Sequence, residues 1–326
     1  MVTDFSEPGG YFQSDNFLSN ESGYQKVIPA LLKRVKPGGA YFGVGPEQNF
    51  TYIVALQPKI AFIIDIRRQN MLEHLFYKAL METSSDREAF LSRLFARHPV
   101  QSMANSTAEV LFRAYKLGHP IPSFFETNIR RVVEYLEKEK GFKLSDQDKA
   151  GIRHVAQAFF KSGPNLSYTF TGGYGDSRRM PSYSDLMTES DGVSRNWNFL
   201  ATEDQFQAIQ RMQKSNLIVP LVGDFAGPKA IRSIARYVQE HRSTVRIFYT
   251  SNVEQYLFQD NDKWKRFYES VLFLPTDSTS TFIRYVLEAE RYGRARTSLT
   301  STMTSTMNAY RGGGIQQYYD IVRLSR

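Results

Sequence analysis

The stretch from Ala40 to Asn70 constrains the fold most, because it alternates short apolar runs with a glycine turn and a helical segment. Ala40 to Gly45 reads as a strand that ends in the tight turn Gly43-Val44-Gly45, and Pro46 suits the first residue of a helix. Ile60 to Ile66 is an unbroken apolar run, which is typical of a central parallel strand covered on both faces. This order of segments predicts half of a dinucleotide- or nucleoside-binding α/β domain.

Asp65 closes the second predicted strand, at about the twenty residues from the glycine turn that are expected of an acid that hydrogen-bonds a ribose hydroxyl. The alternative is structural: the glycines only turn the chain, and Asp65 only caps the helix that begins near Asn70. A third glycine is missing, so a ligand with a ribose but no diphosphate fits better. If the carboxylate points into a crevice, Asp65→Ala should abolish nucleoside binding and leave the fold largely intact.

Gly43-Val44-Gly45 followed by Asp65 resembles motif I and the strand-two acid of class I S-adenosylmethionine-dependent methyltransferases. The resemblance implies a Rossmann-like fold with S-adenosylmethionine as cofactor. The position two before the first glycine is usually acidic in that family and is Tyr41 here, which leaves the methionine amino group of the cofactor without its expected partner. Three segments are also similar to a largely uncharacterised bacterial family of methyltransferase-like proteins: SDNFLSNE (Ser14 to Glu21), GVGPEQNFTYI (Gly43 to Ile53) and YTSNVEQYL (Tyr249 to Leu257).

Composition excludes several classes of protein. The chain of 326 residues contains no cysteine, which removes disulfides, thiolate nucleophiles and cysteine-ligated metals. Its formal net charge is +8, but the basic residues occur in pairs and not in long runs, so specific nucleic-acid binding is disfavoured. No apolar stretch approaches about eighteen residues and the first residues do not resemble a signal peptide. We therefore expect no membrane span and a cytoplasmic protein, with a secreted mature form as the alternative.

The pattern as a whole predicts a Rossmann-like, mostly parallel α/β sheet with helices on both faces and a helical insertion. We expect an N-terminal arm or lid and the first half of this domain in residues 1–85, a helical insertion and a long loop in 86–200, and the second half in 201–326. The insertion either covers the ligand crevice or forms a homodimer contact. Arg291 to Gly314 is low in complexity and is predicted to be a mobile loop.

The second half of the domain resumes the α/β pattern. Leu217 to Val222 is a predicted strand in which Pro220 requires either an edge position or a bulge. Val245 to Tyr249 is the next predicted strand. Two further apolar runs are predicted to complete the sheet, Val271 to Leu274 and Tyr318 to Leu324.

Polar residues gather at the ends of the predicted strands, where open α/β sheets bind ligands. We predict that the cofactor is bound by Gly43, Gly45, Glu47, Asp65, Arg67 and Asp224, and the substrate by Ser251, Asn252 and Glu254. Caps and turns are the structural alternatives for these residues. The histidines share no motif, so we expect packing or helix-surface roles for His74 and His154 and no metal site. Tyrosines such as Tyr168 and Tyr183 either stack on an adenine, a sugar or an aromatic substrate, or pack in the core or anchor the long loop.

Together, the residues and the resemblance predict an S-adenosylmethionine-dependent methyltransferase-like protein that acts on an unknown small acceptor. Methyl transfer needs mainly proximity and orientation, so the lack of an obvious base does not argue against it. The alternative is a non-catalytic ligand-binding or interaction protein that retains the fold.

Overall fold

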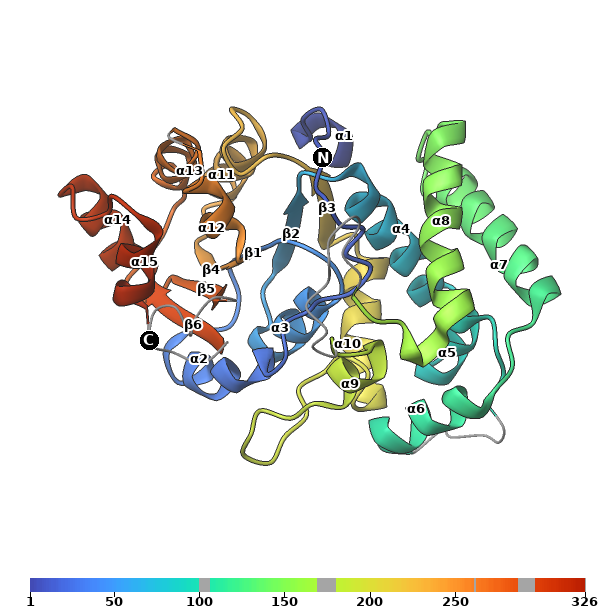
Figure 1. Ribbon diagram of the computed structural model, residues 1–326. Coiled ribbons are helices and arrows are strands. Elements are labelled where there is room, and N and C mark those ends of the chain that lie inside the picture. The colour runs from blue at the N-terminus through green and yellow to red at the C-terminus, as the bar shows by residue number, and fades with distance from the viewer. Residues whose placement is uncertain (100–105, 169–179, 261, 287–296, 326) are drawn as a thin grey trace.

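The computed structural model describes residues 1–99, 106–168, 180–260, 262–286 and 297–325, and its centre is a mostly parallel sheet (Figure 1). The strands are β1 (Ala40–Gly43), β2 (Ile60–Asp65), β3 (Ile218–Val222), β4 (Val245–Ser251), β5 (Thr281–Val286) and β6 (Thr297–Thr302). Their order is β3-β2-β1-β4-β5-β6, and only β6 runs antiparallel to its neighbour. This is the order of a doubly wound sheet that reverses between β1 and β4. The predicted fold class is confirmed.

Helices cover both faces of the sheet. Before β3 they are α1 (Val2–Phe5), η1 (Tyr24–Val27), α2 (Ile28–Arg34), α3 (Gln48–Leu56), α4 (Arg68–Glu82), α5 (Arg87–Phe95), α6 (Ala108–Leu117), α7 (Pro122–Glu134), η2 (Tyr135–Glu139), α8 (Asp146–Ser162), η3 (Gly163–Asn165), α9 (Tyr183–Thr188) and α10 (Glu203–Lys214). After β3 they are α11 (Ala230–Glu240), α12 (Val253–Leu257), α13 (Lys263–Val271), α14 (Met303–Arg311) and α15 (Tyr318–Leu324). In Figure 1, α2 and α3 lie on one side of the sheet and α11 and α13 on the other. None of the described helices is both long and apolar enough to cross a membrane.

A row of four phenylalanines crosses the sheet. Phe42 pairs in register with Phe62 and with Phe248, and Phe248 pairs with Phe282. The ring centroids of these pairs are 5.8, 5.3 and 5.7 Å apart, and all four side chains are fully buried. Phe267 of α13 packs on Phe248, so this row is the centre of the core beneath α11 and α13. The apolar continuity of the parallel strands follows from this burial on both faces.

The edge of the sheet at β3 explains Pro220. β3 pairs only with β2, so one side of the strand has no neighbour that needs a proline N–H. Of the two alternatives expected for Pro220, an edge position or a bulge, the structure shows the edge position. The N-terminal arm, residues 1–23, closes this edge, because the Glu7 N–H donates to the Val222 carbonyl at 2.8 Å and the Ser6 hydroxyl accepts from the Val222 N–H at 3.0 Å.

Two predicted strands and one predicted loop are wrong. Val271 to Leu274 forms the end of α13 and the turn after it, and Tyr318 to Leu324 is α15. The sheet is completed by β5 and β6, and β6 and α14 occupy most of the range from Arg291 to Gly314 that was predicted to be a mobile loop. The first residues of that range lie outside the described residues.

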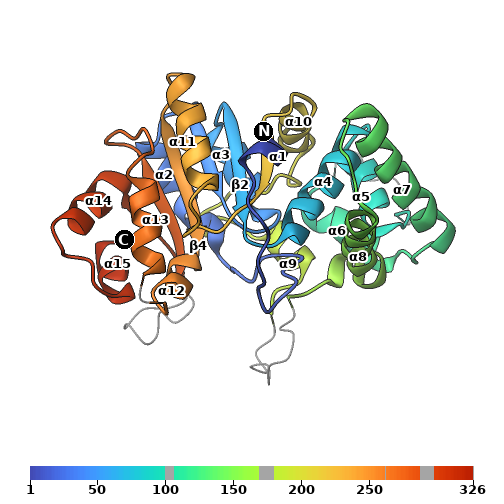
Figure 2. The same ribbon diagram turned by 90° about the horizontal axis from the view of Figure 1, so that it is seen from above.

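The predicted helical insertion forms a lobe beside the β3 edge of the sheet (Figure 2). Within the described part of 86–160 the chain is helical and contains no strand, as predicted. α5, α7 and α8 pack on one another and on α4, and the Arg68 guanidinium joins the lobe to the sheet domain through Asp148 at 2.6 and 3.0 Å. The predicted long loop contains η3 and α9, and Tyr183 of α9 is fully buried in the core.

Candidate functional site

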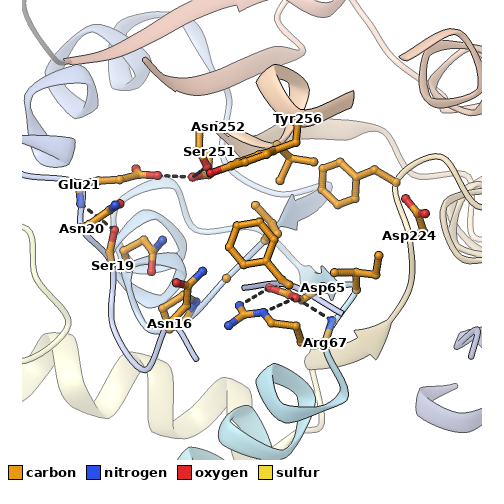
Figure 3. Close-up of a pocket in the computed structure, with 18 of the residues that line it drawn as sticks. Asn16, Ser19, Asn20, Glu21, Asp65, Arg67, Asp224, Ser251, Asn252 and Tyr256 are labelled. Atoms are coloured by element: carbon orange, nitrogen blue, oxygen red, sulfur yellow. Dashed lines mark hydrogen bonds and ion pairs between the residues drawn. The ribbon is translucent and has the colours of Figure 1, made fainter. Parts of the chain in front are cut away.

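A cavity of about 260 Å³ lies at the carboxyl end of the sheet, where the strand order reverses. It receives residues from the ends of β1 through β4, including Gly45, Asp65, Asp224 and Asn252. The carboxyl ends of parallel strands meet at one edge of a sheet, which brings these segments together although they are far apart in sequence. Figure 3 shows the side chains of Asp65, Asp224 and Asn252 around the same space.

The N-terminal arm forms the roof of this cavity. Phe12, Asn16 and Glu21 of the arm line it, and the Phe12 ring meets Tyr256 of α12 edge to face with centroids 5.2 Å apart. The Arg67 guanidinium anchors the arm, since it donates to the carbonyl oxygens of Ser14 and Asp15 at 3.2 and 2.5 Å. The expectation that the first residues form an arm is confirmed. From the insertion and loop, Tyr168 is the described residue that reaches the lining.

Asp65 lines the cavity but is engaged by Arg67. The carboxylate accepts from Arg67 Nη2 at 2.7 Å and from Nε at 3.0 Å, and the Arg67 backbone N–H donates to Oδ1 at 2.9 Å. Both side chains are buried, so the pair is held in a low-dielectric environment. The expected cap of the following helix is absent, because α4 begins at Arg68 without a side-chain cap. Removal of Asp65 would leave a buried guanidinium without its carboxylate, so the structure favours a loss of stability in Asp65→Ala over an intact fold.

Glycine is required at the two positions of the turn, Gly43 and Gly45, for different structural reasons. Gly45 lines the cavity and has a φ of +79°, which favours glycine. Gly43 is not among the lining residues, and a Cβ there would lie 1.9 Å from Asn49 Oδ1. The Asn49 amide donates to the carbonyls of Val44, Gly45 and Pro46 at 2.9, 3.1 and 2.7 Å, and its Oδ1 accepts from the Tyr41 hydroxyl at 2.8 Å. The turn is therefore held from its inner side.

Three predicted residues at the ends of β3 and β4 line the cavity, namely Asp224, Ser251 and Asn252. Asp224 Oδ1 accepts from the Ala226 N–H at 2.9 Å, as a turn residue does. Asn252 precedes α12 without capping it, and its Oδ1 accepts only a 3.3 Å bond from the Ser251 hydroxyl among the described residues. Its side chain is thus available to a ligand.

Glu254, predicted to bind substrate, lies outside the lining and serves the core. Its carboxylate accepts from Arg284 Nε at 2.5 Å and Nη2 at 3.2 Å, from the Thr250 hydroxyl at 3.0 Å and from the Tyr268 hydroxyl. Arg284 and Glu254 are both almost fully buried. A carboxylate with all these donors is a structural anchor between β4, β5 and α13.

Glu47, predicted to bind the cofactor, is also outside the lining and is fully buried at the start of α3. Burial raises the pKa of Glu47 to about 8, against the opposing effect of the backbone amides of Glu47 and Ser19. Burial likewise raises the pKa of Glu73 in α4, and the nearby Glu47 raises it further. Beside them, burial lowers the pKa of His74 to about 4, and its Nε2 lies 2.9 Å from the Gly45 carbonyl. His74 is therefore a neutral packing residue.

Glu21 is the functional candidate that the sequence patterns missed. It lines the cavity, is 1% exposed, and accepts a hydrogen bond from the Ser251 hydroxyl (Figure 3). Burial raises the pKa of Glu21 to about 7, although the hydroxyls of Ser251 and Tyr249 lower it. The two segments that it joins, Ser14 to Glu21 and Tyr249 to Leu257, were both singled out by resemblance, which was the available signal.

The described residues hold no group of three or more histidines, cysteines or acids that could bind a metal ion. A family model described as a domain of unknown function (DUF7790) matches residues 16–311. The matched range includes the arm from Asn16, the helical insertion and all of the described strands. The curated proteins contain no match to the chain.

Proposed function

We propose that this chain, which belongs to the DUF7790 family, binds a nucleoside-type small molecule in the cavity, with S-adenosylmethionine as the candidate, and transfers its methyl group to a small acceptor. The observation that carries the proposal is the position of the cavity at the carboxyl ends of β1 and β4, where the strand order reverses. In open α/β sheets this is the place where ligands bind.

The size and walls of the cavity support a ligand as large as a nucleoside. Its volume of about 260 Å³ is near the lower limit of about 300 Å³ that is usual for small-molecule sites, which disfavours a dinucleotide. Phe12, Tyr168 and Tyr256 provide aromatic surfaces for a base, and Asn252 provides an amide for hydrogen bonds.

The charges in the cavity disfavour a phosphate. Arg67 is neutralised by Asp65, and Lys263 lies 3.3 Å from Asp260. The glycine turn Gly43-Val44-Gly45 also lacks the third glycine of the phosphate-binding fingerprint. A ligand with a ribose and no diphosphate fits these groups best.

Binding without transfer is the second candidate function, and a specific observation favours it. Asp65 is the residue that would hold the ribose, but its carboxylate is paired with the Arg67 guanidinium. Tyr41, which stands where the family usually has an acid, is packed into the core and donates to Asn49. A fold of this kind can therefore retain a ligand and lack the groups that orient it for transfer.

Isothermal titration with S-adenosylmethionine and S-adenosylhomocysteine tests the proposal. We expect saturable binding that Asn252→Ala weakens about tenfold or more, which corresponds to the loss of about 1.4 kcal/mol. Glu240→Gln, at the exposed end of α11, is the matched control and should bind as the wild type does.

Transfer is then measured with methyl-labelled S-adenosylmethionine and a mixture of small-molecule acceptors. Label in an acceptor supports the methyltransferase, whereas binding with no transferred label supports the second candidate. If neither ligand produces heat or raises the melting temperature, the nucleoside proposal is refuted.

A further inference from the structure

Glu21 is a buried acid of the cavity that has no cationic partner within the described part of the chain. Its Oε1 accepts from the Ser251 hydroxyl, whereas its Oε2 has no hydrogen-bond partner of ordinary geometry there, although the Tyr249 hydroxyl lies near enough to lower the pKa of the carboxyl group. An acid that is 1% exposed and unpaired costs the fold free energy, whether it is held charged or neutral. When such an acid lies in the wall of a cavity, this cost indicates that a bound ligand supplies its missing partner.

The neighbours of Glu21 do not supply the missing charge. Among the described residues, the hydroxyls of Tyr41 from β1, Tyr52 from α3 and Tyr249 from β4 interact electrostatically with it, and burial raises the pKa of each well above its usual value. They are neutral donors near neutral pH. The cations of the lining, Arg67 and Lys263, are paired with Asp65 and Asp260.

Ser251 is held in a strained backbone conformation that turns it toward Glu21. Its φ is +51°, in the left-handed region that disfavours a residue with a Cβ, and the register between β4 and β5 shifts between Tyr249 and Ser251. Strain of this kind is retained where the position serves a site. Here it brings the Ser251 hydroxyl to one carboxylate oxygen and leaves the other oxygen uncommitted (Figure 3).

We infer that Glu21 binds a protonated primary amine of the small molecule that occupies the cavity. A guanidinium binds best through two parallel bonds to both carboxylate oxygens, and one oxygen of Glu21 is already used by Ser251. A single ammonium group needs only the other oxygen. A metal ion would need more acidic or histidine ligands than the described residues bring together.

The inference rests on the proposed function insofar as the cavity binds a small molecule, and it narrows the ligand to one with an amino group. In an amino-acid-bearing nucleoside the α-ammonium would meet Glu21. The arm would thereby supply the acid that β1 lacks at Tyr41. The site would be complete only with the arm in place.

Titration with S-adenosylhomocysteine and with 5′-methylthioadenosine tests this assignment, because the second compound keeps the nucleoside and lacks the amino acid. We expect Glu21→Gln to weaken S-adenosylhomocysteine binding about tenfold or more and to leave 5′-methylthioadenosine binding unchanged. Ser251→Ala keeps the carboxyl group and should retain the preference for the amine. Equal binding of S-adenosylhomocysteine by the wild type and Glu21→Gln would overturn the inference.

The number of protons that the protein releases on ligand binding distinguishes a loss of the Glu21 charge from a mere loss of packing in Glu21→Gln. A bound ammonium stabilises the charged form of Glu21, so the wild type should release protons on binding S-adenosylhomocysteine near neutral pH. Calorimetric titrations in two buffers with different ionisation enthalpies measure the number of protons released per ligand bound. Glu21→Gln should release fewer protons than the wild type, and an unchanged release would contradict the assignment.

An alkylamine separates this inference from the proposed function. If neither nucleoside binds, the proposed function fails, and the inference is decided by thermal unfolding with n-butylamine and with butyrate. We expect butylammonium, but not butyrate, to stabilise the wild type, and Glu21→Gln to lose this effect. If butylammonium has no effect, or the same effect on both proteins, Glu21 is not an amine site.

Discussion

Glu47→Gln should make the protein more stable at alkaline pH, and the gain should depend on pH in a defined way. The folded-state pKa of Glu47 is about 8, against 4.5 for an ordinary glutamate. Between these values the unfolded chain releases a proton that the folded chain retains. The stabilising effect of the retained proton is complete below a pH of about 4.5 and is lost as the pH rises to about 8.

The size of the effect follows from the shift. Each pH unit in this window removes about 1.4 kcal/mol from the free energy of unfolding, and the full shift corresponds to an upper value of about 5 kcal/mol. Glutamine has nearly the same shape and cannot ionise, so the variant lacks this loss. Glu73 is ionised more easily once Glu47 is neutral, which adds to the gain at high pH.

Urea unfolding at a series of pH values from about 5 to about 8 measures the difference between variant and wild type. The two should be close at the acidic end and diverge by about 1.4 kcal/mol per pH unit toward the alkaline end. Glu240→Gln, an exposed replacement of the same chemistry, should follow the wild type throughout. A difference that is constant with pH would refute the reasoning, since it would mean that Glu47 carries the same charge in the folded and the unfolded chain throughout this range and that its pKa is not raised by folding.

Two further substitutions test the core and the cavity wall. Phe248→Ala should lower the free energy of unfolding by about 3–5 kcal/mol, because it opens a void in the phenylalanine row. The control is Phe273→Ala, whose side chain is 52% exposed and whose loss should cost less than about 1 kcal/mol. Equal losses of stability in urea unfolding would show that the row is not tightly packed. Asp65→Ala should lower it by about 3–5 kcal/mol by leaving Arg67 buried and unpaired. A melting temperature equal to that of the wild type would show that the guanidinium finds another partner.

The strands that could be predicted from the sequence are the buried ones that consist of consecutive apolar residues. Ile60 to Ile66 contains β2, which pairs with a parallel strand on each side, and Pro220 limited its strand to an edge or a bulge, of which the edge is found. β5 and β6 were missed because Arg284 and the hydroxyl side chains of β6 do not resemble a core. Arg284 is buried only because Glu254 and Ser301 meet it in three dimensions.

The short apolar run at Tyr318 fits a strand or a helix equally well, and the overlooked signal was its capping box. The Asp320 carboxylate accepts from the N–H groups of Gln316 and Gln317 at 2.9 and 3.1 Å, which is the carboxylate half of a capping box at the start of α15. In an apolar segment of only a few residues, a helix-start signal of this kind is better evidence for a helix than the apolar run is for a strand.

The site was partly predictable because its geometry follows from topology. Once the strands are parallel, Asp65, Asp224 and Asn252 must come to the same edge of the sheet, and all three line the cavity. Glu21 was not predictable in the same way, because the arm has no hydrophobic period that fixes where it lies. Glu254 was misassigned because a strand-end acid can point to the core as well as to the crevice, and its partner Arg284 lies 30 residues away in sequence.

The arm that roofs the cavity joins residues at opposite ends of the chain, since Glu21 and Ser251 are separated by 230 positions. Closing so long a loop is entropically costly, so we expect the roof to be added late in folding, after the sheet has formed. The same contacts would be the first to open in the native state. The rate at which a ligand enters would then follow the local unfolding of the arm, and amide hydrogen exchange in residues 11–21 would report the frequency of that opening.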